Sequence, residues 1–237
     1  MPETLHGRAL LGLVLALLVS ACGRADPDPH PPNAPTADLE RRYQQARDAS
    51  HRGDYAVAYC ILRELAEQYD DPRAAFLLGW MYHNGYGLAI DDEQAIAWWT
   101  KAARHGHADA WYALGQLMEL DTKDKARKAK ALDYYLEAAR LGHEDAQQWL
   151  RHRLAHLKPD PRLLDALQKE WRVFGPTRKI KARAANLRAK PSTKAKRLRT
   201  LPKGTPVVVI GALGRKWRKV GVPGTRLTGW IYAPLLD

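Results

Sequence analysis

The chain has 237 residues, of which 46% are apolar and 8% aromatic, enough to build packed cores in two modest domains with tails. This composition excludes a chain that lacks a folded core over most of its length. The net charge of +12 is unevenly spread, because residues 172–237 contain 17 Lys or Arg and one acidic residue, Asp237, which leaves the first 171 residues at −4. Such asymmetry points to an anionic partner for the basic part.

Residues 1–21 have the pattern of an export signal. Arg8 precedes an unbroken apolar run from Ala9 to Val19. As a helix this run would be about 16 Å long, too short for a bilayer core of about 30 Å but suited to the central region of a signal peptide. We therefore expect the protein to be exported.

The residues that end this segment, Val19-Ser20-Ala21-Cys22, resemble the bacterial lipoprotein box. The resemblance implies that Cys22 carries lipid on its sulfur and that its acyl chains anchor the mature protein, since each buried methylene contributes about 0.8 kcal/mol. Gly23, where some lipoproteins have Asp, implies passage to the outer membrane of a Gram-negative cell, with the protein on the periplasmic face. The alternative is an ordinary secretory cleavage site with an incidental cysteine.

Residues 22–38 have the composition of a tether. Five prolines lie between Gly23 and Thr36. Such a stretch cannot build a core and favours an extended polyproline helix of about 3.1 Å per residue, which would span up to roughly 40 Å. We expect a spacer between the anchor and the folded part.

The stretch from Ala74 to Leu150 repeats itself every 36 residues. Within each copy the apolar residues recur at i, i+3, i+4, i+7 and i+8, which is one face of an amphipathic helix. The sequence therefore predicts stacked helical hairpins. The residues that match one period apart are Ala74 with Ala110 and Ala146, Gly79 with Gly115, Ala102 with Ala138, Ala103 with Ala139, Gly106 with Gly142, and Asp109 with Asp145.

Glycines occupy fixed points of each copy. Gly79 and Gly115 lie inside the first helix of a hairpin, where glycine costs roughly 1 kcal/mol against alanine. We therefore expect a close backbone approach there, where the two helices of the hairpin cross. Gly106 and Gly142 follow the second helix and suit the left-handed residue that ends a helix.

This pattern resembles the Sel1-like repeat, a relative of the tetratricopeptide repeat. The likeness lies in LGW, GYG and DEQAIAWWTKAARHG of the first copy and in LG and KALDYYLEAARLG of the second. The resemblance implies an all-α solenoid that binds a protein or peptide partner, and it implies no catalytic residue. With a degenerate hairpin upstream and a capping helix downstream, we expect the repeat domain to span residues 39–158 and a linker helix to span 159–175.

The aromatic residues of the repeats fall into two groups. Four occupy core phases, which favours packing over ligand binding. These four are Trp98, Trp99, Tyr134 and Tyr135. For three others, the position in the helical period does not decide between the core and the surface. These three are the candidates for lining a concave groove: Trp80, Trp111 and Tyr112.

The sequence shows no arrangement typical of an enzyme. His152 with His156 and His105 with His107 could each contact a metal, but no Cys or carboxylate cluster completes a ligand set, so we expect surface histidines. There is no Ser-His-acid arrangement, no paired carboxylates in a glycine-bounded site and no phosphate-binding loop. The sequence thus predicts a non-enzymatic protein without metal or cofactor.

Residues 176–237 change to a β pattern. Short β-prone runs alternate with Gly and Pro clusters, which predicts a small barrel. The segment resembles the bacterial SH3-like domain in five ordered motifs: NLRAKPS, LPKGTPV, WRKV, GWI and a final LL. The resemblance implies an all-β barrel after the solenoid, with Val220 and Trp230 in its core.

This barrel is more basic than the resemblance requires. Its ligand candidates lie in the loop after the first motif and on the exposed sides of two aromatic residues: Arg188, Lys190, Lys194, Lys196, Arg197, Trp217 and Tyr232. Some family members bind cell-wall peptides, so the resemblance implies peptidoglycan, or another anionic envelope component such as anionic lipid, as a partner. The basic excess also fits nucleic acid, but export argues against a nucleic-acid partner.

Two functions are left open. The first is a non-enzymatic envelope lipoprotein whose repeats recruit a protein while the barrel binds an anionic wall component. The second is an accessory or regulatory subunit of an envelope enzyme or secretion complex, with a barrel that only completes the fold. The salt dependence of binding to cell-wall sacculi separates them.

Overall fold

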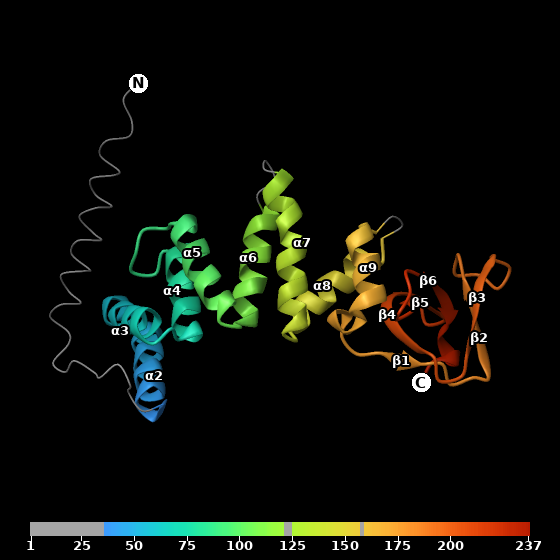
Figure 1. Ribbon diagram of the computed structural model, residues 1–237, viewed down its shortest axis with the longest axis horizontal. Helices are drawn as coiled ribbons and strands as arrows, with labels where there is room; N and C mark the ends of the chain where they lie inside the picture. Colours follow the sequence, from blue (N-terminus) through green and yellow to red (C-terminus); the bar gives the residue numbers. More distant parts are fainter. Residues whose placement is uncertain (1–35, 121–124, 157–158) are drawn as a thin grey trace, which may run out of the picture. The chain divides into compact units, whose positions relative to one another are not determined.

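The computed structural model describes residues 36–120, 125–156 and 159–237, in which α-helices are followed by an antiparallel sheet (Figure 1). The predicted fold class, a helical-hairpin array followed by a small β-domain, is confirmed. The chain divides into two compact units, one ending at Leu114 and one beginning at Gly115. The expected signal peptide, the lipidation site Cys22 and most of the tether lie outside the described residues.

The first unit is built from consecutive helices that pack against one another as hairpins. Its described helices are α2 (Thr36–Arg52), α3 (Tyr55–Gln68), α4 (Pro72–Asn84), α5 (Asp92–Arg104) and the start of α6 (Ala108–Leu120). Small and large apolar residues alternate on the buried faces, as Ala58, Leu62 and Ala66 of α3 illustrate. The helical period of 3.6 residues places these side chains on one face.

Asp71 begins α4 and connects it to α2. Its carboxylate accepts hydrogen bonds from the backbone N–H groups of Arg73 at 2.8 Å and Ala74 at 3.3 Å, the geometry of an N-cap. The Arg73 guanidinium donates to the same carboxylate at 2.8 Å and also to Glu40 of α2. Burial by itself raises the pKa of Asp71, but the hydrogen bonds from Arg73 and the backbone outweigh it and hold this pKa below its ordinary value.

Gly79 and Gly115 leave room for an aromatic ring of the next helix. An added Cβ at Gly79 would lie 2.4 Å from Cδ1 of Trp99, and one at Gly115 would lie 2.9 Å from Cε1 of Tyr135. Trp99 and Tyr135 are one repeat period apart, so both hairpins use the same contact. The expected close approach is confirmed, but the group that approaches is a ring rather than the backbone of the partner helix.

The glycines that end the second helix of each copy have the expected conformation. Gly106 has a φ of 86° and Gly142 a φ of 90°. Residues with a Cβ rarely adopt this left-handed region. The prediction of helix ends at these two positions is therefore confirmed.

The second unit contains the rest of α6, three more described helices and a short 3-10 turn. These are α7 (Lys125–Arg140), α8 (Glu144–Leu154), α9 (Pro161–Lys169) and η1 (Trp171–Phe174). The segment from α9 to η1 buries five apolar side chains: Leu163, Ala166, Leu167, Val173 and Phe174. The segment expected as a linker helix is therefore part of a packed core.

The sheet that follows has the strand order β1-β4-β5-β6-β2-β3, and every paired neighbour is antiparallel. Its strands are β1 (Arg178–Lys179), β2 (Ala184–Arg188), β3 (Arg197–Pro202), β4 (Pro206–Leu213), β5 (Trp217–Gly221) and β6 (Thr228–Tyr232). Because side chains alternate along a strand, Leu187, Val220 and Ile231 face one buried core. The expectation that Val220 is a core residue is confirmed.

Contacts within the second unit fix the sheet to the helices before it. An added Cβ at Gly221 would lie 2.9 Å from a methyl carbon of Leu167 in α9, and the Gly224 N–H donates to the Leu167 carbonyl at 3.2 Å. The Lys219 ammonium donates to the carbonyl of Ala155, the C-cap of α8, as cations near helix C-termini do. The barrel is thus attached by packing as well as by the chain.

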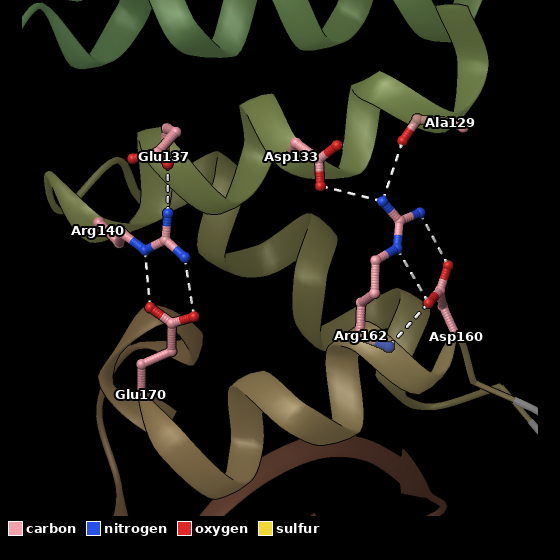
Figure 2. Close-up of polar contacts among 7 residues, drawn as sticks. All are labelled: Ala129, Asp133, Glu137, Arg140, Asp160, Arg162 and Glu170. Carbon is pink, nitrogen blue, oxygen red and sulfur yellow. Dashed lines mark hydrogen bonds and ion pairs between the residues drawn. The ribbon is translucent and has the colours of Figure 1, made fainter. Parts of the chain in front are cut away.

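Two arginines join α7 to the segment that carries α9 (Figure 2). Arg140 of α7 donates to both carboxylate oxygens of Glu170, at 2.7 and 2.9 Å. Arg162 of α9 donates to Asp133 of α7 at 3.0 Å and to Asp160 at 3.1 Å. Such exposed pairs contribute about 0–1 kcal/mol each, so they orient α9 while the buried apolar residues supply most of the stability.

We predict that Gly79→Ala lowers the free energy of unfolding by about 1–3 kcal/mol, the usual cost of overpacking, because the new methyl overlaps the indole of Trp99. Urea unfolding followed by circular dichroism measures the change. In a Trp99→Leu background the same substitution should cost less, because leucine leaves room for the methyl. An equal cost in both backgrounds would contradict the role of the ring.

We also predict that Asp71→Ala costs about 0.5–2 kcal/mol at pH 7. Because the folded pKa of Asp71 is lowered, its stabilising contribution is fully present above the unfolded value of about 3.9 and is lost as pH falls through the folded value. The difference between parent and variant, measured by urea unfolding at pH 7 and pH 3, should therefore shrink at pH 3. Asp54→Ala is the matched control, since the Asp54 side chain occupies an N-cap position without a cap hydrogen bond.

Candidate functional site

The strand register brings cations and an aromatic ring into one row on an outer face of the sheet. Arg197 of β3 pairs with Arg188 of β2 across a shift in register that follows Leu187, and Arg188 is opposite Trp230 of β6. Trp230 is in turn opposite Lys219 of β5, whose ammonium is occupied by the carbonyl at the end of α8. Direct cross-strand partners project from the same side of a sheet, so these four side chains share one face.

A second row lies beside the first. Trp217 of β5 and Tyr232 of β6 are cross-strand partners, and their rings meet edge to face with centroids 5.8 Å apart and an interplanar angle of 67°. Tyr232 is 40% exposed, and Trp217 is half-buried. We call the resulting surface the cation–aromatic face, which consists of Arg188, Arg197, Trp217, Trp230 and Tyr232.

The interpretation of Trp230 as a core residue is wrong. Its neighbours along β6, Gly229 and Ile231, are buried, whereas Trp230 is half-buried. Because side chains alternate across a strand, Trp230 must project away from the core that contains Ile231. The GWI motif has tryptophan and isoleucine side by side, and only the pairing with β2 and β5 shows which of the two faces outward.

The loop between β2 and β3 adds further cations beside the cation–aromatic face. Lys190, Lys194 and Lys196 in this loop are exposed. The Arg188 guanidinium donates to the Ala195 carbonyl at 2.9 Å and so holds the loop against the sheet. Of the seven ligand candidates chosen from the sequence, the structure thus places four on the cation–aromatic face and three in the adjoining loop.

These cations have no carboxylate from their own domain. The one acid of residues 172–237, Asp237, accepts from the Lys179 backbone N–H at 2.8 Å through its side chain and from Arg178 through its main-chain carbonyl. Like charges directly opposite in a sheet, as at Arg188 and Arg197, are destabilising. A ligand that supplies carboxylates or phosphates would relieve this repulsion, and the flat rings would contact its less polar parts.

The groove candidates lie in the first unit and differ in exposure. Trp80 of α4 is 43% exposed and stacks on Tyr86, with ring centroids 5.6 Å apart. Trp111 and Tyr112, at the start of α6, are half-buried. A pocket of about 320 Å³ opens beside Trp80. Sequence reasoning missed Tyr86, although it lies within the GYG motif.

The residues assigned to the helical core divide into two classes. Trp99 and Tyr135 are 2% and 1% exposed, as expected. Trp98 and Tyr134, one position earlier in each copy, are only half-buried, because the ring that packs on glycine takes the centre of the interface. The apolar stripe of each helix is thus narrower than the sequence suggests.

The described histidines do not gather with other possible ligands into a metal site. His152 and His156 are exposed, with ring centroids 5.3 Å apart, and His107 stacks on Phe76 at 4.6 Å. Within residues 36–120, 125–156 and 159–237, no group of three or more His, Cys, Asp or Glu residues is arranged to hold a metal ion. In the same part of the chain, no helix is both long and apolar enough to cross a membrane.

Comparison with protein families assigns both parts of the chain. Residues 72–107 and 108–143 each match the Sel1 repeat model, and residues 183–237 match the Bacterial SH3 domain model. The first match covers the 36-residue period from α4 to α7, and the second covers strands β2 to β6. The resemblances inferred from the sequence motifs of these two parts are confirmed.

Three solved structures are similar to parts of the chain. A Sel1 repeat protein from Oxalobacter formigenes is 28% identical, with 58% of this chain and 96% of that chain covered and a TM-score of 0.41. A protective antigen of uropathogenic Escherichia coli, described as displaying an SLR fold, is 24% identical over 51% of this chain and 26% of its own, with a TM-score of 0.44. An immunity protein from Pseudomonas aeruginosa is 18% identical over 68% and 78%, with a TM-score of 0.31. The family assignment rests on the family models.

Proposed function

Because two Sel1 repeats are followed by a bacterial SH3 domain, we propose that this protein is a non-enzymatic scaffold of the cell envelope. The repeats hold a protein partner, and the cation–aromatic face binds peptidoglycan or another anionic polymer of the envelope. The observation that supports this proposal best is the combination, on one side of the sheet, of three aromatic rings with two arginines whose domain contains a single acid, Asp237.

Peptidoglycan has the two kinds of group that this face can contact. Its peptides carry carboxylates, which pair with arginine through charge-assisted hydrogen bonds. Its sugars present C–H surfaces to the flat faces of Trp217, Trp230 and Tyr232, and such rings give a large contact area at a low cost in side-chain entropy. An exposed ion pair is worth about 0–1 kcal/mol, so useful affinity requires several contacts together.

The attachment of the barrel to the preceding helices adds to this proposal. Leu167 packs on Gly221, and Lys219 bonds to the end of α8, so the barrel is in contact with both α8 and α9. A ligand on the cation–aromatic face would then be held at a fixed distance from the α7–α8 hairpin. The helical repeats would bind a protein and the barrel would bind the cell wall, so the chain would connect that protein to the wall.

We predict that the chain with Cys22→Ser sediments with purified sacculi at low ionic strength and is released as salt is raised. Replacing Lys190, Lys194 and Arg197 together with Glu should weaken binding about tenfold or more, because each lost contact contributes up to about 1 kcal/mol. Equilibrium sedimentation at several salt concentrations measures both effects.

The matched control reverses three exposed cations at the other end of strands β2 and β3: Lys181, Arg183 and Lys203. It changes the net charge equally and should keep most of the binding. If both triple variants lost the same affinity for sacculi, the effect would be one of net charge alone. If the variant at Lys190, Lys194 and Arg197 bound as well as the parent, the proposed site would be contradicted. No binding of the parent at low salt would favour an accessory subunit whose barrel only completes the fold.

We further propose that acyl chains on Cys22 anchor the protein on the periplasmic face of the outer membrane. The lipoprotein box and the apolar run before it support this proposal. Cys60 of α3 is the one other cysteine in the sequence.

The anchor can be tested in the exporting cell. Cys22→Ser should abolish labelling with radioactive palmitate and move the protein from the membrane fraction to the soluble periplasmic fraction. Cys60→Ser is the matched control and should change neither. The anchor is contradicted if the parent chain takes up no acyl label and the mass of the exported protein equals that of the chain without its signal peptide and without added lipid.

A further inference from the structure

Three aromatic rings form an exposed stack in the first unit. Tyr86 lies between Tyr55 of α3 and Trp80 of α4, with centroid distances of 5.3 and 5.6 Å and interplanar angles of 22° and 18°. Trp80 is 43% exposed and Tyr86 36%. We call Tyr55, Trp80 and Tyr86 the aromatic shelf. The pocket beside it is completed by Ser50, His51, Leu62, Leu77 and Met81.

The glycines on either side of Tyr86 hold the shelf in shape. Gly85 and Gly87 have φ values of 74° and 70°, which favour glycine, and an added Cβ at Gly87 would lie 2.4 Å from Cβ of Tyr55. The Tyr86 N–H donates to the Met81 carbonyl at 3.0 Å. The rings are therefore positioned before any ligand binds, which lowers the entropy lost on binding.

Exposed rings in a row are the surface that recognises polyproline helices. The stack covers the faces of Tyr86, so proline rings would pack on the exposed parts of Trp80 and Tyr86 that border the pocket. The backbone carbonyls of a polyproline helix make no internal hydrogen bonds and stay free to accept. The indole N–H of Trp80 is a donor of the kind that such carbonyls require. The chemistry of the shelf thus fits a proline-rich segment better than a charged or helical one.

This chain contains such a segment directly before α2. Residues 27–32 read Pro-Asp-Pro-His-Pro-Pro, and 35 residues in all precede Thr36. Thr36 lies at one end of α2, and Ser50, a wall of the pocket, lies near the other end, about 21 Å away at 1.5 Å per residue. A polyproline chain running back from Thr36 covers this distance in about seven residues, which brings Pro29 to the level of the shelf.

Charge favours the same occupant. His51 lies in the wall of the pocket, and Arg52, which also pairs with Asp54, follows it at the end of α2. Segment 27–32 contains Asp28 and directly follows Asp26, and residues 25–35 contain no Lys or Arg. Because a short stretch of chain joins the segment to α2, the effective concentration of the segment at the shelf is about 1 mM. If the separate peptide bound with a Kd of about 0.1 mM, the shelf would be occupied in most molecules.

We propose that the aromatic shelf binds the proline-rich segment 27–32 of its own chain, which folds the tether back along α2. The occupied shelf shortens the reach of the tether and holds the first unit close to the point where the chain is anchored. The interaction itself does not depend on lipidation of Cys22 or on ligand binding by the barrel.

The test uses fluorine NMR of the chain with Cys22→Ser, labelled with 5-fluorotryptophan. Trp80→Phe identifies the Trp80 resonance among the eight tryptophans. Replacing Pro27, Pro29, Pro31 and Pro32 with Ser should shift the Trp80 resonance and leave that of Trp171, in the second unit, unchanged. Adding a free peptide of residues 24–35 to the serine variant should return the resonance toward its original position.

Three outcomes separate this proposal from its alternatives. An identical Trp80 resonance in parent and serine variant would overturn it, even if added peptide shifts that resonance, because the shelf would then serve only segments from other proteins. A dependence of the parent spectrum on protein concentration would indicate a second copy as the occupant and would also overturn it. In support, Gly87→Ala, whose added methyl overlaps Tyr55 of the shelf, should reproduce the effect of the serine variant, whereas Val57→Ala on the exposed side of α3 should not.

Discussion

The packing of one aromatic ring on one glycine sets the geometry of each repeated hairpin. In the second copy Tyr135 lies against Gly115, and Trp99 does the same in the first. Tyr135 also stacks on Trp149 of α8 at 4.1 Å, and both residues donate to Glu119, at 3.1 and 3.0 Å. One ring therefore defines the spacing within its hairpin and the position of the next helix, on which the barrel depends. A larger residue at the glycine would disturb all of these contacts, because cores are close-packed.

Acids and bases pair on the helices, whereas residues 172–237 contain one acid, and Arg226 of the barrel pairs with Asp165 of α9. Arg140 and Arg162 are paired with acids of α7 and of the α9 segment, and Asp71 is paired with Arg73. In the barrel the single acid is occupied at the chain terminus, so the cations of the β2–β3 region face solvent. Such pairing adds little stability on a surface. The excess of cations in the barrel therefore does not serve to stabilise its fold.

The two binding surfaces proposed for this protein differ in chemistry and lie in different units. The aromatic shelf of the first unit has rings without acids and fits an extended proline-rich chain. The cation–aromatic face of the second unit combines rings with arginines and fits an anionic polymer with sugar rings. A scaffold needs this separation, because two sites of the same chemistry would compete for one ligand.

The sequence by itself determined the repeat period, the helix ends at Gly106 and Gly142, the need for space at Gly79 and the change to a β-domain. These features depend on local propensity and on periodicity, which are written directly in the order of residues. Only the tertiary structure decided that Trp230 faces outward beside Arg188, that Tyr86 completes a stack with Tyr55, and that the expected linker is a packed element. Each of these depends on a partner distant in the chain, and no local pattern specifies which face of an element that partner will cover.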